Sequence, residues 1–229
     1  KCFRNEGVDL RHNPEFTMLE WYRPHFTHVE LMEEVDALLM ATLDTEPAYK
    51  MSYKEAFITY LGVDPLIACS DELLNAMEAS GIDIDTPELL SDDAKLQLLF
   101  SVVIEPSIGQ VRPCFIYGFP ATQAALARIN EEDSRTADRF EVYYKGAELA
   151  NGFYELCAPE EQRNRFYQDN AKRKKANLPE KPIDEYFLAA LASGLPDCAG
   201  VALGIDRLLM LKVGASHIRE VINFPISRA

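Results

Sequence analysis

The spacing of apolar positions predicts an alternation of helices and strands. Between residues 28 and 43, apolar side chains recur every three or four positions with acidic residues between them, as in an amphipathic helix. Residues 15–22 and 114–119 are rich in aromatic and β-favouring side chains and predict strands. Residues 139–156 predict two strands around a turn at Lys145–Gly146, which makes a hairpin.

The second half of the chain continues this pattern. Residues 159–176 predict a polar helix, and residues 184–193 predict another. Residues 200–204 predict a short strand of small residues that leads into a helix over 205–213. Residues 62–112 mix Gly, Pro, Asp and Ser with short helical pieces and predict an inserted helical lobe. Strands, a hairpin and irregular helical stretches together predict an antiparallel sheet flanked by helices, an α+β fold.

Composition excludes several classes of protein. The 229 residues are 48% hydrophobic and 26% charged, which is ordinary globular usage. Asp and Glu outnumber Lys and Arg by 37 to 23, and the net charge of −14 argues against binding a polyanion through the overall field. No apolar run is long enough for a membrane span.

The cysteines and the first residues bear on the protein's setting. The five cysteines lie far apart without a Cys-x-x-Cys pair, which argues against a disulfide framework or a zinc site and favours a reducing compartment such as the cytoplasm. The sequence starts without Met and without signal-peptide character, so we expect it to begin inside a larger protein.

Three clusters of residues are suited to chemistry, and the first runs from Arg4 to Phe16. Two arginines and His12 flank a turn that leads into a predicted strand. Guanidinium groups offer phosphate oxygens a rigid fork of donors, and Phe16 could stack on a base. The alternative is a surface loop whose charges pair with Glu6 and Asp9.

The second cluster lies on the predicted hairpin. Glu141 and Glu148 lie across the turn and could converge, and two carboxylates near a phosphate commonly hold Mg²⁺. Asn151 and Glu155 share a face if no bulge intervenes, whereas Glu148 and Glu155 do not share one within an unbroken strand. The alternative is a set of outward-facing acids, although Glu155 lies among apolar neighbours.

The third cluster is the glycine-containing run 200–207. Small residues let a ligand approach the backbone, and Arg207 would lie in the first turn of a helix. The glycine spacing does not match a dinucleotide-binding fingerprint, and no βαβ unit follows.

Together these clusters resemble the motifs of class II aminoacyl-tRNA synthetases of the lysine type. Residues 3–6 with 12–17 resemble motif 2, residues 204–207 resemble the end of motif 3, and residues 148–156 resemble the lysine-pocket hairpin. The likeness runs in order over essentially the whole chain. It implies one synthetase-like catalytic domain over 1–229, with the helical lobe as an insertion at about 62–112.

Two departures distinguish the chain from lysyl-tRNA synthetases. That group has glycine where this chain has Ala202, and residues 20–25 are closer to the elongation factor P (R)-β-lysine ligases, paralogues that modify a lysine of elongation factor P. Residues 195–204 also resemble those ligases. Motif 1, which builds the dimer interface in this family, would lie upstream of Lys1, so the domain is expected to be partial and the full protein a homodimer.

The resemblance implies a function and two alternatives. The function is ATP- and Mg²⁺-dependent activation of a lysine-like amino acid, with (R)-β-lysine preferred, as an aminoacyl-adenylate that is transferred to elongation factor P. The first alternative is a lysyl-tRNA synthetase fragment that charges tRNA with α-lysine. The second is a synthetase-like module that binds ligand without turnover. We expect the protein acceptor rather than tRNA, and no membrane partner.

The resemblance also implies an ATP site. Its residues would be Arg4, Asn5, Glu6, Arg11, His12, Asn13, Phe16, Glu148, Leu149, Gly204 and Arg207. Arg4 and Arg207 would be the catalytic residues, and Phe16 with Arg207 would sandwich the adenine. Arg11 and His12 would face the outer phosphates.

The same resemblance implies an amino-acid site. Glu155 and Tyr22 would receive the side-chain ammonium, and Asn151 would orient the carboxylate. The methyl group of Ala202 would disfavour an α-amino acid and accommodate one whose amino group lies one carbon further on. Glu141 and Glu148 would hold Mg²⁺ on the phosphates.

Overall fold

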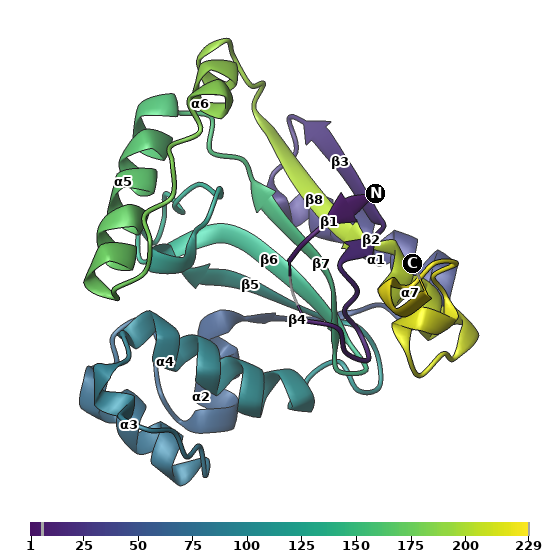
Figure 1. The fold of residues 1–229 in the computed structure, drawn as a ribbon, viewed down its shortest axis with the longest axis horizontal. Coiled ribbons are helices and arrows are strands. Elements are labelled where there is room, and N and C mark those ends of the chain that lie inside the picture. Colours follow the sequence, from purple (N-terminus) through teal and green to yellow (C-terminus); the bar gives the residue numbers. More distant parts are fainter. Residues whose placement is uncertain (6, 229) are drawn as a thin grey trace.

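A six-stranded sheet forms the centre of the molecule in the computed structural model, which describes residues 1–5 and 7–228 (Figure 1). The strand order is β3-β8-β7-β6-β5-β4, and β4–β5 is the parallel pair in an otherwise antiparallel sheet. The strands are β3 (Met18–Pro24), β4 (Tyr49–Ser52), β5 (Cys114–Pro120), β6 (Thr136–Tyr144), β7 (Ala147–Tyr154) and β8 (Cys198–Gly204). The predicted α+β fold and hairpin are confirmed.

The strand predicted over 15–22 is divided between two sheets. Its start, β2 (Glu15–Phe16), pairs with β1 (Cys2–Phe3) in a separate two-stranded sheet, and β3 begins after Thr17. The break has a local cause. The Thr17 backbone N–H donates to Asp206 Oδ2 at 2.6 Å, and its carbonyl accepts from the Ile205 N–H at 3.0 Å. Thr17 is therefore tied to the start of the last long helix rather than to a neighbouring strand.

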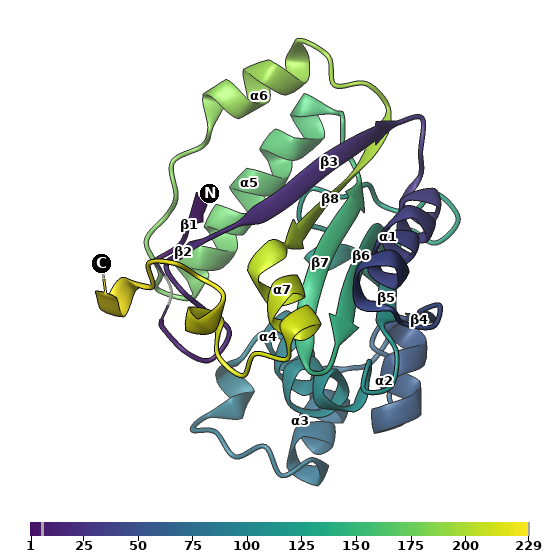
Figure 2. The same cartoon turned by 90° about the vertical axis from the view of Figure 1, so that its right-hand side faces the viewer.

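Two helices cover one face of the sheet, α1 (His28–Leu43) and α7 (Ile205–Val213) (Figure 2). The predicted apolar stripe of α1 is buried against alternate side chains of the central strands. This core comprises Leu31, Met32, Val35, Leu39, Phe115, Phe140, Val142, Ala199, Val201 and Leu203. Both predicted helices are confirmed at the predicted bounds.

A helical lobe packs on the opposite face at the β4–β5 end of the sheet. It contains α2 (Tyr53–Leu61), α3 (Ser70–Ala79), α4 (Asp92–Leu99) and a π-helical turn (Phe100–Ile104). Its core includes Ile116, whereas the adjacent Phe115 belongs to the core under α1, because neighbouring strand residues point to opposite faces. The helices confirm helical content within 62–112. That this segment is an insertion stays a prediction.

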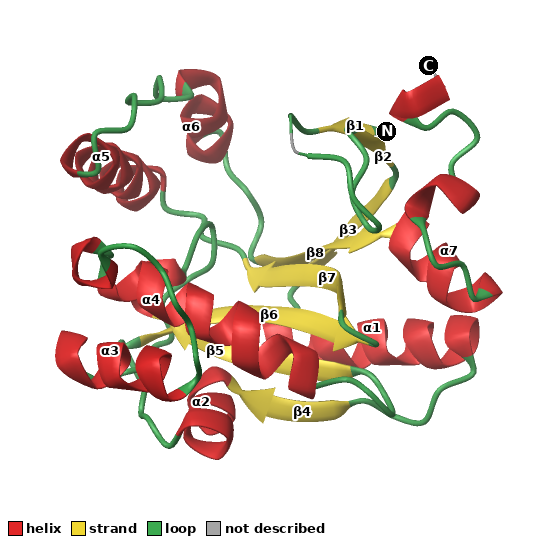
Figure 3. Ribbon diagram, turned by 60° about the horizontal axis from the view of Figure 1, so that its bottom comes forward, coloured by secondary structure: helices red, strands yellow, loops and turns green. Residues whose placement is uncertain are grey.

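Two further helices lie between β7 and β8 in the sequence and pack outside the sheet (Figure 3). They are α5 (Pro159–Lys175) and α6 (Glu185–Ala192), and they pack on each other through Phe166 and Phe187, whose ring centroids are 6.1 Å apart. Gln162 is the buried residue of α5, which agrees with the polar helix predicted here. None of the helices in the described ranges is long and apolar enough to cross a membrane.

Candidate functional site

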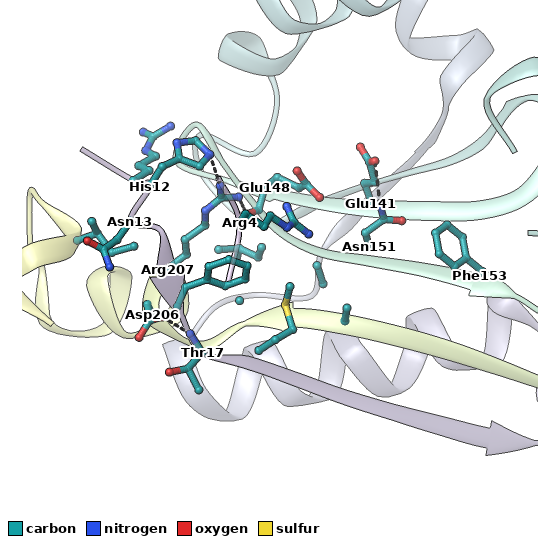
Figure 4. A pocket seen from close by; sticks show the side chains of 18 of the residues that line it. Arg4, His12, Asn13, Thr17, Glu141, Glu148, Asn151, Phe153, Asp206 and Arg207 are labelled. Atoms are coloured by element: carbon teal, nitrogen blue, oxygen red, sulfur yellow. Dashed lines mark hydrogen bonds between the residues drawn. The ribbon is translucent and has the colours of Figure 1, made fainter. Parts of the chain in front are cut away.

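A pocket of about 560 Å³ opens on the same face of the sheet as the helical lobe (Figure 4). Its walls come from the loop between β1 and β2, from β6, β7 and β8, and from the start of α7. Twelve residues proposed from sequence line it: Arg4, Arg11, His12, Asn13, Phe16, Glu141, Glu148, Leu149, Asn151, Ala202, Gly204 and Arg207. The fold thus brings all three clusters, separated by up to two hundred residues, into one site.

Three of the proposed residues that the structure describes, Asn5, Tyr22 and Glu155, do not line this pocket. Asn5 is exposed on the β1–β2 loop, and Glu6 lies outside the described residues. Tyr22 and Glu155 lie further along the same face, where they meet beside Gly200. A Cβ atom added at Gly200 would lie 2.5 Å from both Glu155 Oε1 and Tyr22 Cε1, so only glycine leaves room for these two side chains.

Strand register explains why the amino-acid residues share one face. Asn151 pairs with Glu141 on one side and with Ala202 on the other. Phe153 pairs with Gly200, which in turn pairs with Tyr22. Side chains two residues apart point the same way, so Asn151 and Phe153 form successive rows of one surface.

A bulge in the β6–β7 hairpin brings Glu148 to that surface as well. Tyr143 pairs with Glu148, but Val142 pairs with Ala150, so one extra residue, Leu149, is accommodated in β7. A bulge of this kind reverses the alternation of side chains along one strand. Glu148 and Asn151 have opposite parity, yet both face the pocket.

Glu141 is held by hydrogen bonds from three side chains. Arg139 Nη2 and the Tyr143 hydroxyl donate to its two carboxylate oxygens, and Asn151 Nδ2 lies 3.4 Å from Oε1. Glu141 is 7% exposed, so its charge is compensated by Arg139 inside the protein rather than by water. The carboxylate is therefore fixed in one orientation.

Arg207 links the β1–β2 loop to the hairpin. Its Nη1 donates to the carbonyl of Glu148 at 2.7 Å, and its Nη2 lies 2.8 Å from His12 Nε2. His12 Nδ1 lies 2.9 Å from both carboxylate oxygens of Asp9. A guanidinium only donates and a carboxylate only accepts, so His12 carries its proton on Nδ1 and accepts from Arg207.

Backbone contacts hold the rest of the β1–β2 loop over the pocket. Arg11 Nη2 donates to the carbonyl of Lys145 in the hairpin turn at 3.2 Å. Asn13 is buried, with Nδ2 donating to the Glu15 carbonyl and Oδ1 accepting from the Ile226 N–H. The guanidinium of Arg4 lies 5.3 Å from the ring centroid of Phe16, which makes Phe16 a cation–π platform.

Two glutamates have strongly raised pKa values. Burial, followed by the negative charge of Glu141, raises the pKa of Glu148 to about 7, and Arg207 and Arg139 oppose this shift. Burial alone raises the pKa of Glu155 to about 7. Burial also raises the pKa of Tyr22, with a further contribution from the charge of Glu155.

The metal-binding capacity of the site rests on the Glu141–Glu148 pair. Among the described residues no group of three or more acidic, histidine or cysteine side chains could hold a metal ion. The two carboxylates are nevertheless close enough for one to raise the pKa of the other. This suits a cation that completes its shell with oxygens from a bound phosphate and water.

Sequence reasoning missed several pocket residues. Arg139 and Phe153 line the wall, and Asp206 anchors Thr17. Arg139 has the same strand parity as Glu141, so hairpin alternation could have identified it. Asp206 could not be assigned in this way, because its partner lies 189 residues away.

Comparison with known proteins identifies the family. The family model for tRNA synthetases class II (D, K and N) matches residues 1–228. The chain belongs to this family. Class II synthetases of this group use ATP, which agrees with a pocket lined by arginines and acidic residues.

Individual relatives within the class II family are also similar over the whole chain. The elongation factor P–(R)-β-lysine ligase of Salmonella typhi is 54% identical over 233 residues, covering 100% of this chain and 70% of the relative. The ligases of the same name from Salmonella dublin and Salmonella paratyphi B are 55% and 54% identical over the same shares.

Proposed function

We propose that the protein is an ATP-dependent ligase that activates (R)-β-lysine and transfers it to a lysine side chain of elongation factor P. The observation that carries this proposal is 54% identity, over all of this chain, to proteins named for that reaction. The pocket supports it, because a polar end lined by arginines adjoins a strand face that leads to the buried Glu155. The proposal includes a cytoplasmic location and a homodimer.

The polar end of the pocket would bind ATP. Arg4 would contact the α-phosphate and the substrate carboxylate, and Arg11 and His12 would face the outer phosphates. Phe16 would stack on the adenine with Arg207 near its other face. Asn5, Glu6, Asn13, Leu149 and Gly204 complete the proposed nucleotide site.

Glu141 and Glu148 would hold Mg²⁺. The pair fits a hard cation, because both side chains offer carboxylate oxygens, and the charge of Glu141 adds to burial in raising the pKa of Glu148. When bound, the ion would neutralise charge on the triphosphate during displacement. Arg207 already contacts the Glu148 backbone, so it would add positive charge at the same place.

The strand face would bind the amino acid. The side-chain ammonium of the amino acid would pair with Glu155, beside Tyr22. This ammonium would supply the counter-charge that the buried carboxylate of Glu155 needs. Asn151 would orient the carboxylate, and the Ala202 methyl group, directly across the strand pair, would select the position of the amino group. The spacing of Glu155 and Asn151 would thus select the chain length of the amino acid, and Ala202 would select the position of its second amino group.

The chemistry requires two displacements at these positions. The substrate carboxylate attacks the α-phosphorus, a P–O bond forms, and pyrophosphate leaves. The acceptor amine then attacks the carbonyl carbon of the adenylate, an amide bond forms, AMP leaves with the bonding electron pair, and the amine loses a proton. Both steps need positioning and charge neutralisation rather than a protein nucleophile.

An acceptor assay tests the proposal. The protein is incubated with ATP, Mg²⁺ and either (R)-β-lysine or α-lysine, and unmodified elongation factor P or bulk tRNA is added in separate reactions. We expect intact mass spectrometry to show one β-lysyl group on the protein acceptor and no charged tRNA. A Glu155→Gln variant should give much less product at amino-acid concentrations near the wild-type KM. Charging of tRNA with α-lysine would replace the proposal by a tRNA synthetase. No product but measurable ATP and lysine binding would indicate a binding module.

A further inference from the structure

Arg139 lies inside the pocket wall between two aromatic rings. Its guanidinium carbon is 4.5 Å from the ring centroid of Phe119 and 5.9 Å from that of Phe153. The side chain is 17% exposed and lines the pocket beside Glu141. Cation–π contacts with two rings restrict the movement of the guanidinium, and its hydrogen bonds fix its orientation.

These hydrogen bonds lead to two fixed acceptors. Nη1 donates to the carbonyl of Gln123 at 2.7 Å, and Nη2 donates to Glu141 Oε1. The first contact anchors the guanidinium to the backbone. The second gives Glu141 its compensating charge, so the position of this carboxylate depends on Arg139.

The fixed carboxylate of Glu141 in turn orients the side-chain amide of Asn151. A carboxylate only accepts hydrogen bonds, so the amide of Asn151 turns its Nδ2 toward Glu141, at 3.4 Å. The Oδ1 atom of Asn151 is then buried and has no hydrogen-bond partner among the described residues. Such an atom is costly unless a ligand or water satisfies it, which indicates that the amide is oriented for binding.

We propose that Arg139 is a positioning residue for the amino-acid site. Acting through Glu141, it sets the orientation of the Asn151 amide opposite Ala202. This assignment rests on the proposed function, because it takes the amino acid to bind along β7. A lysine at this position would hold Glu141 less well, because one ammonium cannot contact both rings and also donate to both acceptors in the directions that the guanidinium uses.

The chain offers a matched control in Arg165. Its side chain is 15% exposed, it pairs with Glu161, and it donates to the carbonyls of Ala125 and Ala127. It therefore anchors the segment that also contains Gln123, but it is not part of the pocket wall. Loss of loop anchoring alone would affect both arginines alike.

The test compares Arg139→Gln, Arg139→Lys and Arg165→Gln in amino-acid-dependent ATP–pyrophosphate exchange at saturating Mg²⁺. We expect Arg139→Gln to raise the KM for (R)-β-lysine about tenfold, a larger factor than the rise in the KM for ATP, because saturating Mg²⁺ offsets a weaker hold on Glu141. Arg139→Lys should give an intermediate KM, and Arg165→Gln should stay within about twofold of wild type. Calorimetric titration of the amino acid should give the same order of affinities.

A double-mutant cycle with Glu141→Gln separates positioning from general damage. If Arg139 acts through Glu141, adding Arg139→Gln to Glu141→Gln should change the KM by no more than about twofold. An undiminished tenfold effect in that background, or equal effects of the Arg139 and Arg165 variants, would overturn the assignment while the proposed function stands. A wild-type protein with neither exchange activity nor amino-acid binding would instead overturn the proposed function.

Discussion

Glu148 and Glu155 face the same side of the sheet, and burial raises the pKa of each to about 7, but only Glu148 has charged neighbours that also shift its pKa. After burial, the charge of Glu141 raises the pKa of Glu148 further, and the charges of Arg207 and Arg139 lower it. Burial alone raises the pKa of Glu155, and no charged group among the described residues contributes to this shift. In the pocket, charges of both signs are therefore present before a ligand binds, whereas Glu155, further along the strand face, needs a cation from a ligand.

The sharpest test of this difference is removal of the charge at Glu155. Glu155→Gln keeps the size of the side chain but cannot pair with an ammonium. We expect the KM for the amino acid in pyrophosphate exchange to rise about 100-fold, because truncating one partner of a buried charge pair costs several kcal/mol. The KM for ATP should stay within about twofold.

Glu160→Gln is the matched control for this substitution. Glu160 is an exposed glutamate five residues away, in the first turn of α5, and should tolerate the change without effect. Equal increases in both Michaelis constants for Glu155→Gln would show that Glu155 does not act separately from the polar end of the pocket.

A smaller effect is expected at Ala202, which lies between Glu155 and the polar end of the pocket. Ala202→Gly removes one methyl group opposite Asn151. We expect the preference for (R)-β-lysine over α-lysine, measured as the ratio of kcat/KM values, to fall about tenfold, because a methyl-sized change is worth about 1–3 kcal/mol. An unchanged ratio would remove Ala202 from the specificity-determining residues.

Local pattern was sufficient to predict most elements of the fold. The helix over 28–43 and the hairpin around Lys145–Gly146 are where apolar spacing and turn chemistry place them. Thr17 shows the limit of this approach. The sequence around it favours one continuous strand, but a hydrogen bond to Asp206, remote in sequence, divides that strand in two.

Prediction of the site had a similar limit. Recognition of the motifs brought Arg4, His12 and Arg207 together, although their contacts span nearly the whole chain. Strand parity alone would have placed Glu148 away from Asn151, because the Leu149 bulge leaves no clear signal in the sequence. The hydrogen bond that holds Glu141 depends on how Arg139 packs against Phe119 and Phe153, which only the folded structure specifies.

The pH dependence of amino-acid binding should report on Glu155, which lies beyond the pocket on the same strand face. Only the ionised form of Glu155 attracts an ammonium, and burial raises its pKa to about 7 in the free protein. The KM for the amino acid should therefore fall as pH rises, by about fourfold between about pH 6.5 and about pH 8. In Glu155→Gln this dependence should disappear, and its persistence would assign the titration to another group.

The smallest effect, on stability, distinguishes the two glutamates by their surroundings. A carboxyl whose folded pKa is about 7 stabilises the protein below its ordinary pKa of 4.5, and this contribution is lost as pH rises through about 7. The glutamine of Glu148→Gln never ionises. At about pH 8 the substitution should therefore increase the free energy of unfolding by about 1 kcal/mol, a value reduced by the partial exposure of the side chain. At about pH 4.5 it should change the free energy of unfolding little. Chemical denaturation at both pH values measures this.

Mg²⁺ and ATP should cancel the gain in stability of Glu148→Gln, because they would stabilise the ionised wild-type side chain. They should leave any gain for Glu155→Gln in place, since burial rather than a neighbouring charge raises the pKa of Glu155.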